Sequence, residues 1–129
     1  MPLEPDQTTP WTFAPMRRKD IPEVMVVERL CFHDPWDKSA FERETVNTFS
    51  RSLLARDASG RLLGYAMWWV AGPEFHLLNL AVHPAARRQG LGRELLNRVV
   101  ADARKDQAEF VALEVRTSNL AAKTLYQRA

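Results

Sequence analysis

The stretch that decides the fold reads Leu77-Leu78-Asn79-Leu80-Ala81-Val82-His83-Pro84-Ala85-Ala86-Arg87-Arg88-Gln89-Gly90-Leu91-Gly92. Its apolar first part predicts a buried strand, His83-Pro84 predicts a short turn, and a helix is predicted from Gly90 to about Lys105. The two glycines remove Cβ atoms where the N–H groups of the first helical turn have no partner in the helix. Because these groups lie at the positive end of the helix dipole, the turn is predicted to bind phosphate.

Three arginines surround this turn and are expected to add mobile positive charge: Arg87, Arg88 and Arg93. Glycine pairs also begin many helices that bind nothing, so the surrounding sequence has to decide between the two interpretations. No Lys-Ser or Lys-Thr follows Gly92, as a nucleotide-hydrolase phosphate loop requires, and the third glycine of a dinucleotide-binding fingerprint is missing. The stretch therefore predicts a phosphate site of another kind.

The composition is that of one small globular protein. The chain has 129 residues, of which 46% are hydrophobic and 26% charged, with a net charge of +2 and no long basic run. We expect a flexible N-terminal tail over residues 1–10 and a single domain over residues 11–129, with no direct binding of nucleic acid. The single cysteine, Cys31, is expected to be a small buried hydrophobe and favours a reducing compartment. No signal peptide or membrane-spanning segment is expected, and the predicted location is cytoplasmic.

The hydrophobic pattern predicts an α/β fold with a mixed sheet. A first helix is expected after Asp20 as its cap, and it should bury the face formed by Ile21, Val24, Val27, Leu30 and Cys31. A second helix is expected from Lys38 to Asn47. The strands are predicted at Trp11 to Met16, Ser52 to Arg56, Arg61 to Val70, Phe75 to Val82 and Phe110 to Val115. All but the last should form an antiparallel meander, and the last should lie parallel to its neighbour because a helical crossover leads to it.

Two residues near the C-terminus are candidates for chemistry. Glu114 alternates with apolar residues in its strand, and burial there would raise the pKa of its carboxyl toward that of a working base. The alternative is that Glu114 lies at an exposed strand end and pairs with Arg116. Tyr126 lies seven residues after Asn119, a predicted helix cap, and a helical tyrosine usually serves a core or its rim. The three histidines lack metal-ligand spacing, so no metal site is predicted.

Arg-x-x-Gly-x-Gly after a strand that ends Leu-Ala-Val resembles the acetyl-CoA pyrophosphate loop of the GNAT N-acetyltransferase superfamily. Leu113 to Ala122, Leu125-Tyr126 and Phe32 to Trp36 resemble the RimI-type ribosomal-protein alanine N-acetyltransferases. The likeness runs from about Met16 to Ala129. It implies the GNAT acyl-CoA N-acyltransferase fold, with acetyl-CoA as cosubstrate and no metal.

The resemblance also implies roles for individual residues. It makes Glu114 the base that accepts the amine proton, Tyr126 the acid that protonates the departing thiolate, and Asn119 a contact of the pantetheine arm. The cosubstrate contacts that it implies are the backbone of Leu80, Ala81 and Val82, together with Arg87, Arg88, Gln89, Gly90, Leu91, Gly92 and Arg93 in the loop.

The implied acceptor is the N-terminal α-amine of a protein, above all the N-terminal alanine of a small-subunit ribosomal protein. Two alternatives stay open, a GNAT enzyme for a small-molecule amine and a catalytically silent acetyl-CoA-binding domain. The family continues past the tyrosine-bearing helix with Gly-Phe and a last hairpin. We therefore expect this chain to be C-terminally incomplete, with Phe110 to Val115 at a sheet edge, good acetyl-CoA binding and poor turnover.

Overall fold

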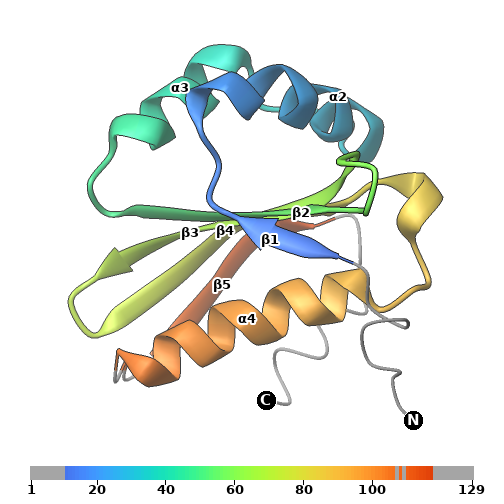
Figure 1. The fold of residues 1–129 in the computed structure, drawn as a ribbon. Coiled ribbons are helices and arrows are strands. Elements are labelled where there is room, and N and C mark those ends of the chain that lie inside the picture. Colours follow the sequence, from blue (N-terminus) through green and yellow to red (C-terminus); the bar gives the residue numbers. More distant parts are fainter. Residues whose placement is uncertain (1–10, 107, 109, 118–129) are drawn as a thin grey trace, which may run out of the picture.

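The computed structural model of the protein describes residues 11–106, 108 and 110–117, the last stretch by its backbone. Within these residues, five strands form one sheet in the order β1-β2-β3-β4-β5. Helices α2 and α3 cover one face of this sheet and α4 covers the other, so the molecule has three layers (Figure 1). The elements in chain order are β1 (Thr12–Ala14), the 3-10 turn η1 (Arg18–Asp20), α2 (Ile21–Cys31), α3 (Lys38–Val46), β2 (Ser50–Arg56), β3 (Leu62–Ala71), β4 (Glu74–Val82), the 3-10 turn η2 (Pro84–Ala86), α4 (Leu91–Lys105) and β5 (Phe110–Thr117).

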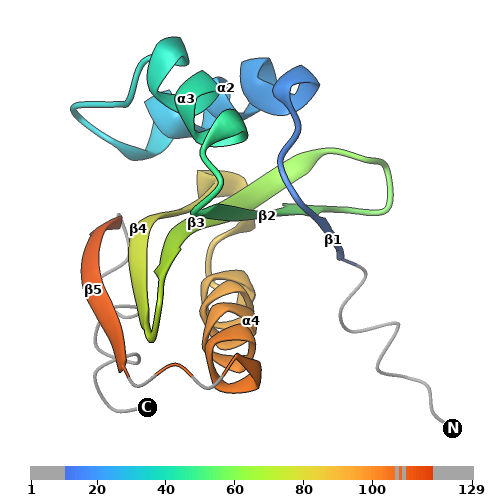
Figure 2. The same cartoon turned by 90° about the vertical axis from the view of Figure 1, so that its left-hand side faces the viewer.

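The predicted strand arrangement is confirmed. Strands β1 to β4 pair antiparallel, and β5 pairs parallel with β4 after the crossover through α4. Figure 2 shows β5 at the edge of the sheet beside β4, with α4 beneath. The boundaries differ from the prediction by up to two residues, since β2 begins at Ser50, β5 continues to Thr117 and β1 is limited to Thr12–Ala14.

The prediction for α2 was wrong in two details. Leu30 is 52% exposed, whereas Glu28 is fully buried. Glu28 lies four residues after the buried Val24, on the same face, and Leu30 is turned from Glu28 by about 200° at the helical pitch of 3.6 residues per turn. Asp20 does not cap α2 with its side chain. Its carboxylate accepts the N–H of Arg17 instead, at 2.8 Å, and also contacts Arg56.

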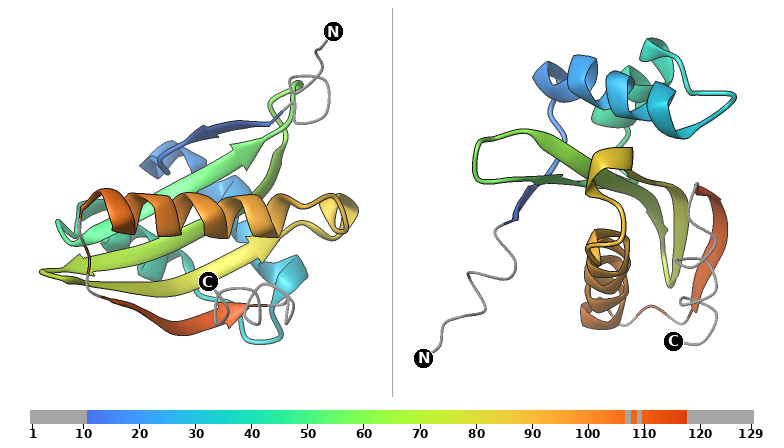
Figure 3. Two further views of the ribbon diagram at one scale, coloured as in Figure 1. Left: turned by 90° about the horizontal axis from the view of Figure 1, so that it is seen from below. Right: turned by 90° about the vertical axis from the view of Figure 1, so that its right-hand side faces the viewer.

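Helix α4 confirms the predicted helix after Gly90, and it is amphipathic. It packs across β3 and β4 on the face opposite α2, as the view from below shows (Figure 3). Its buried residues are Leu91, Gly92, Leu95, Leu96, Val99 and Ala103. These side chains and the apolar residues of that sheet face form one core, while α2 and α3 close a second core on the other face.

An extra residue in β4 changes which face of the sheet its side chains reach. Asn79 pairs with Met67 of β3 and Leu77 pairs with Trp68, so Leu78 has no partner and forms a bulge. Leu77 belongs to the α4 core, whereas Asn79 points to the α2 face and contacts Glu28 there. If Leu78 were paired in a regular strand, alternation would place Asn79 on the same face as Leu77.

Gly64 in β3 allows α4 and the two central strands to lie close together. A Cβ atom at this position would lie 2.7 Å from the backbone oxygen of Ala81 and 3.3 Å from Cδ2 of Leu91. The first contact is with backbone, so a side chain cannot relieve it by rotating.

We therefore predict that Gly64→Ala destabilises the protein by about 1–3 kcal/mol, the usual cost of an extra methyl group in a packed core. The free energy of unfolding, from urea titration followed by circular dichroism, measures this change. An unchanged free energy of unfolding would show that the close approach of β3 and β4 at Gly64 and Ala81 does not require glycine.

Candidate functional site

The predicted phosphate turn has the backbone shape of an anion site. After η2, both Arg88 (φ 66°) and Gly90 (φ 86°) adopt left-handed conformations. Helix α4 begins at Leu91, and its first internal hydrogen bond runs from the N–H of Glu94 to the carbonyl oxygen of Gly90, at 3.0 Å. The N–H groups of the residues between them thus have no partner inside the helix, at the positive end of its dipole.

The space around this turn suits a bulky anionic group. A Cβ atom at Gly90 would have no heavy atom within 4 Å, so the space beside the turn is open. Within the protein itself, only the positive φ favours glycine at this position. Arg88 and Arg93 are exposed on either side of the turn. This arrangement fits the diphosphate of an acyl-CoA, which needs several N–H donors and compensating positive charge.

Arg87 behaves differently from the expectation of mobile charge. Its Nε donates to the carbonyl oxygen of Val82 at 3.2 Å, and its Nη2 lies 3.6 Å from the sulfur of Cys31. Cys31 also donates from Sγ to the same carbonyl oxygen, at 3.2 Å. Arg87 and Cys31 therefore fix the end of β4 and the end of α2 against each other, and Cys31 is only partly buried.

His83 shapes the entrance to the turn. Its Nδ1 accepts the N–H of Ala85 at 3.0 Å, which caps η2. Partial burial lowers the pKa of the His83 imidazole, and the nearby guanidinium groups of Arg61 and Arg87 lower it further. The neutral imidazole is thus favoured, and only this form leaves Nδ1 able to accept.

The predicted cosubstrate strand is buried between the two cores. Leu80 pairs with Ala66 of β3 and with Thr117 of β5, the last described pair of the β4–β5 ladder. Ala81 and Val82 continue beyond that pair along β3 alone among the described residues. Of the two, Val82 has its carbonyl oxygen occupied by Arg87 and Cys31.

The structure places the backbone of Glu114 beside the β4 bulge. Leu77 lies opposite Leu113, and Asn79 lies opposite Arg116, so the register of β5 shifts over the interval that contains Glu114. Asn119 and Tyr126 lie outside the described residues.

Sequence reasoning missed a buried polar cluster on the α2 side of the sheet. The carboxylate of Glu28 accepts the backbone N–H of Trp36 at 2.8 Å and Nδ2 of Asn79 at 3.0 Å, and it also accepts the hydroxyl of Tyr65. Glu28, Tyr65 and Asn79 are all fully buried. The one available signal was the position of Glu28 on the apolar stripe of α2.

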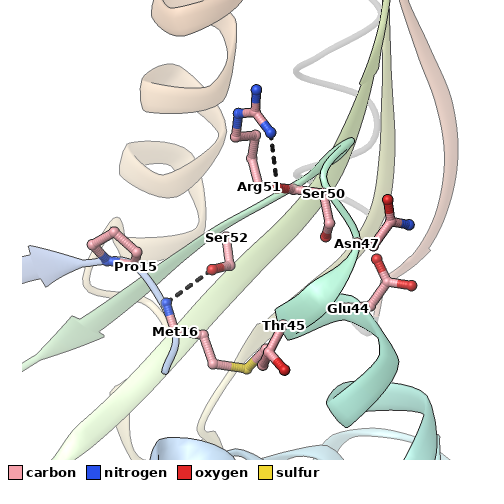
Figure 4. Close-up of a pocket in the computed structure, with 8 residues that line it drawn as sticks. All are labelled: Pro15, Met16, Glu44, Thr45, Asn47, Ser50, Arg51 and Ser52. Atoms are coloured by element: carbon pink, nitrogen blue, oxygen red, sulfur yellow. Dashed lines mark hydrogen bonds between the residues drawn. The ribbon is translucent and has the colours of Figure 1, made fainter. Parts of the chain in front are cut away.

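A cavity of about 220 Å³ lies elsewhere, between the β1 end, β2 and α3 (Figure 4). The cavity is near Ser50, which pairs with Trp69 toward the C-terminal end of β3. Val82, which leads into the predicted phosphate turn, pairs with Gly64 toward the other end of β3. Its two charged side chains have local partners, because Glu44 accepts from Nε1 of Trp69 and Arg51 donates to the carbonyl oxygen of Ser50. We assign no ligand to this cavity.

Within the described residues, no three His, Cys, Asp or Glu side chains are grouped as a metal site would require. In the same part of the chain, no helix combines the length and apolar character needed to cross a membrane.

A mixed sheet with a turn of this shape between its fourth strand and the following helix is compatible with a protein that binds acyl-CoA. The chain belongs to the acetyltransferase (GNAT) family, whose sequence model matches residues 21–129. As a member of that family it is an N-acetyltransferase that takes its acetyl group from acetyl-CoA. The expected fold and enzyme class are thereby confirmed.

Two named relatives and one solved structure show what the chain is similar to within this family. The chain is 31% identical over 116 residues to the ribosomal protein bS18-alanine N-acetyltransferase of Escherichia coli strain K12, covering 90% of this chain and 77% of that protein. It is 35% identical over 126 residues to the N-alpha-acetyltransferase RimI of Mycobacterium tuberculosis, covering 93% and 77%. The crystal structure of the ribosomal-protein-S18-alanine N-acetyltransferase from Escherichia coli superimposes with a TM-score of 0.81 at 30% identity, over 92% of this chain and 75% of that one.

His83 provides a prediction for the pH dependence of stability. Because its pKa is lowered in the folded state, the unfolded chain binds the proton more readily, and His83 favours folding only above its ordinary pKa. His83→Asn keeps a side-chain acceptor for the N–H of Ala85 and removes the titration. Between about pH 8 and about pH 5, the wild type should lose more unfolding free energy than His83→Asn. Equal losses in denaturant titrations would contradict this.

The turn provides a prediction for acetyl-CoA binding. Gly90→Val introduces a branched side chain at a positive φ and fills the open space, so affinity in calorimetry should fall about tenfold or more. Arg88→Gly keeps the left-handed backbone and removes one charge, so it should weaken binding less. Arg104→Ala, at the other end of α4, is the matched control for charge and should leave the affinity unchanged. Unaltered binding by Gly90→Val would show that the diphosphate binds elsewhere.

Proposed function

We propose that this protein transfers the acetyl group of acetyl-CoA to the N-terminal α-amine of a protein, most specifically to the N-terminal alanine of a small-subunit ribosomal protein. The anion-binding turn between β4 and α4 carries the acetyl-CoA part of the proposal. The names of the relatives at 31% and 35% identity support the acceptor. Ribosomal proteins are made in the cytoplasm, so the proposed location is cytoplasmic.

The cosubstrate supplies a thioester whose carbonyl carbon accepts a nucleophile. In the proposed reaction, the lone pair of the α-amine forms the new C–N bond, the C–S bond breaks, and the sulfur leaves as a thiolate. The proposed role of Glu114 is to accept the amine proton, through a water molecule. Tyr126 is proposed to donate its phenolic proton to the thiolate, and Asn119 to bind the pantetheine arm. An α-amine has a pKa of about 8, so a modest base is sufficient.

The position of Glu114 in the strand ladder supports this assignment. Its backbone lies beside the bulge of β4, and two residues further along β4 the cosubstrate strand begins at Leu80. The turn that is suited to the diphosphate follows the end of the same strand. A bound acetyl-CoA that runs from the turn along β4 would therefore bring its thioester toward Glu114.

Mass spectrometry of synthetic peptides tests the proposed acceptor. Incubation with acetyl-CoA should acetylate a peptide with a free N-terminal alanine, whereas the same peptide with a blocked N-terminus and an internal lysine should stay unmodified. A polyamine or an aminoglycoside that is acetylated faster than any peptide would overturn the proposed acceptor. A lack of transfer to every amine, with acetyl-CoA bound, would favour a silent binding domain.

Glu114→Gln tests the proposed base. Without a carboxylate to accept the proton, turnover should be lost mainly at low pH and should recover in part as the α-amine deprotonates by itself near pH 8. A pH–rate profile of kcat/KM that matches the wild type would remove Glu114 from the mechanism.

A further inference from the structure

Glu28 joins three elements that are distant in the sequence. Its Oε2 accepts the backbone N–H of Trp36, in the loop between α2 and α3, at 2.8 Å. Its Oε1 accepts Nδ2 of Asn79 in β4 at 3.0 Å and the hydroxyl of Tyr65 in β3. One carboxylate oxygen thus holds the loop, and the other is fixed by the sheet.

This arrangement is costly as a simple packing device. A fully buried carboxylate loses its hydration, and its hydrogen bonds, three of which come from donors in the described part of the chain, offset that loss only while the donors stay in place. Two of the donors, Asn79 and Tyr65, come from the rigid centre of the sheet. The third donor, the N–H of Trp36, belongs to a loop. The carboxylate therefore fixes the position of that loop relative to the sheet.

The loop that Glu28 holds lies next to the proposed reaction centre. Asn79 directly follows the bulged residue of β4 and lies opposite Arg116, two residues after Glu114 in β5. At the end of α2, where the loop begins, Cys31 reaches the carbonyl oxygen of Val82. Residues 33–35 of the loop are exposed.

The aromatic side chain at the end of the loop is also fixed. The ring of Trp36 packs on Phe41 of α3 with ring centroids 5.3 Å apart, and Phe41 meets Tyr65 edge-on at 6.3 Å. The backbone of Trp36 is held by Glu28, and its ring is held by an aromatic chain that returns to Tyr65. The far end of the loop therefore has one position relative to β3 and β4.

We infer that Glu28 is a positioning residue for the acceptor, which holds the loop of residues 32–36 beside the β4 bulge so that the loop forms one wall of the peptide site. This inference rests on the proposed function. Glu28 does not touch the reacting atoms. Its effect reaches the acceptor through the N–H of Trp36, while the anion-binding turn for acetyl-CoA lies beyond the end of β4.

Three variants separate positioning from simple packing. Glu28→Met keeps the bulk of the side chain and leaves the Trp36 N–H without its acceptor. Glu28→Gln retains one oxygen for the Trp36 N–H. Its new amide can donate to the Tyr65 hydroxyl and, once the Asn79 amide flips, to Oδ1 of Asn79, so the bond to Trp36 can persist. Tyr65→Phe is the matched control, because it removes a different hydrogen bond from the same carboxylate and leaves the loop contact in place.

The first measurement does not depend on catalysis. Hydrogen–deuterium exchange followed by mass spectrometry should show faster exchange at residues 32–37 in Glu28→Met, and rates close to the wild type in Glu28→Gln and Tyr65→Phe. Thermal unfolding identifies a temperature at which all variants are folded. Unchanged exchange in a folded Glu28→Met would overturn the inference whatever the enzyme acetylates. If Glu28→Met does not fold, faster loop exchange in Tyr65→Phe than in Glu28→Gln would overturn it.

The second measurement compares the two substrates. In Glu28→Met, KM for the peptide should rise about five- to tenfold, the effect of one lost hydrogen bond, while KM for acetyl-CoA stays within about twofold. Glu28→Gln should restore most of the peptide KM. An equal rise in both KM values, or a peptide KM raised as much by Tyr65→Phe, would assign Glu28 to packing alone. If a polyamine replaces the peptide as acceptor, the proposed function fails, and the same comparison with that amine still tests the positioning role.

Discussion

The extra residue Leu78 in β4 is the constraint on which the rest of the structure depends. Before it, Phe75 and Leu77 face the α4 core, and after it Leu80 and Val82 face that same core, although an uninterrupted strand would have placed Asn79 there. The bulge therefore keeps the α4 core apolar and delivers the Asn79 amide to the other face, where Glu28 needs a donor. One unpaired residue thus reconciles two hydrophobic cores with a buried polar cluster.

The same strand fixes the phosphate turn from the other side. The carbonyl oxygen of Val82 is held by Arg87 and Cys31, and the chain then turns back through two left-handed residues into α4. Helix α4 lies close to β3 and β4, a position for which Gly64 leaves room. The directions of the free N–H groups in the turn therefore follow from the packing of α4 and not from the turn sequence alone. A short turn is well defined here because both of its ends are anchored.

Local signals in the sequence were sufficient for most of the fold. The strand, turn and helix around Gly90, the amphipathic stripe of α4 and the parallel crossover to β5 all follow from short-range patterns. The Glu28 cluster could not be predicted in this way, because its partners Tyr65 and Asn79 are 37 and 51 residues away in the chain. The bulge was not predicted either, because Leu77 to Val82 reads as one largely apolar run in which the change of alternation at Leu78 is not apparent. The roles of Tyr126 and Asn119 remain predictions that come from resemblance, and that of Glu114 remains a prediction from its place in an apolar strand and from the resemblance.

The two halves of the proposed site rely on electrostatics of different kinds. Arg88 and Arg93 are exposed, so salt weakens their attraction for an approaching diphosphate. At physiological ionic strength this attraction is largely screened beyond about 8 Å. The hydrogen bonds of Glu28 are buried, where water and salt do not weaken them. Attraction of acetyl-CoA can therefore vary with ionic strength while the wall beside the acceptor keeps its position. This separation suits an enzyme whose donor is a flexible, highly charged molecule and whose reaction requires the amine to be aligned closely with the thioester.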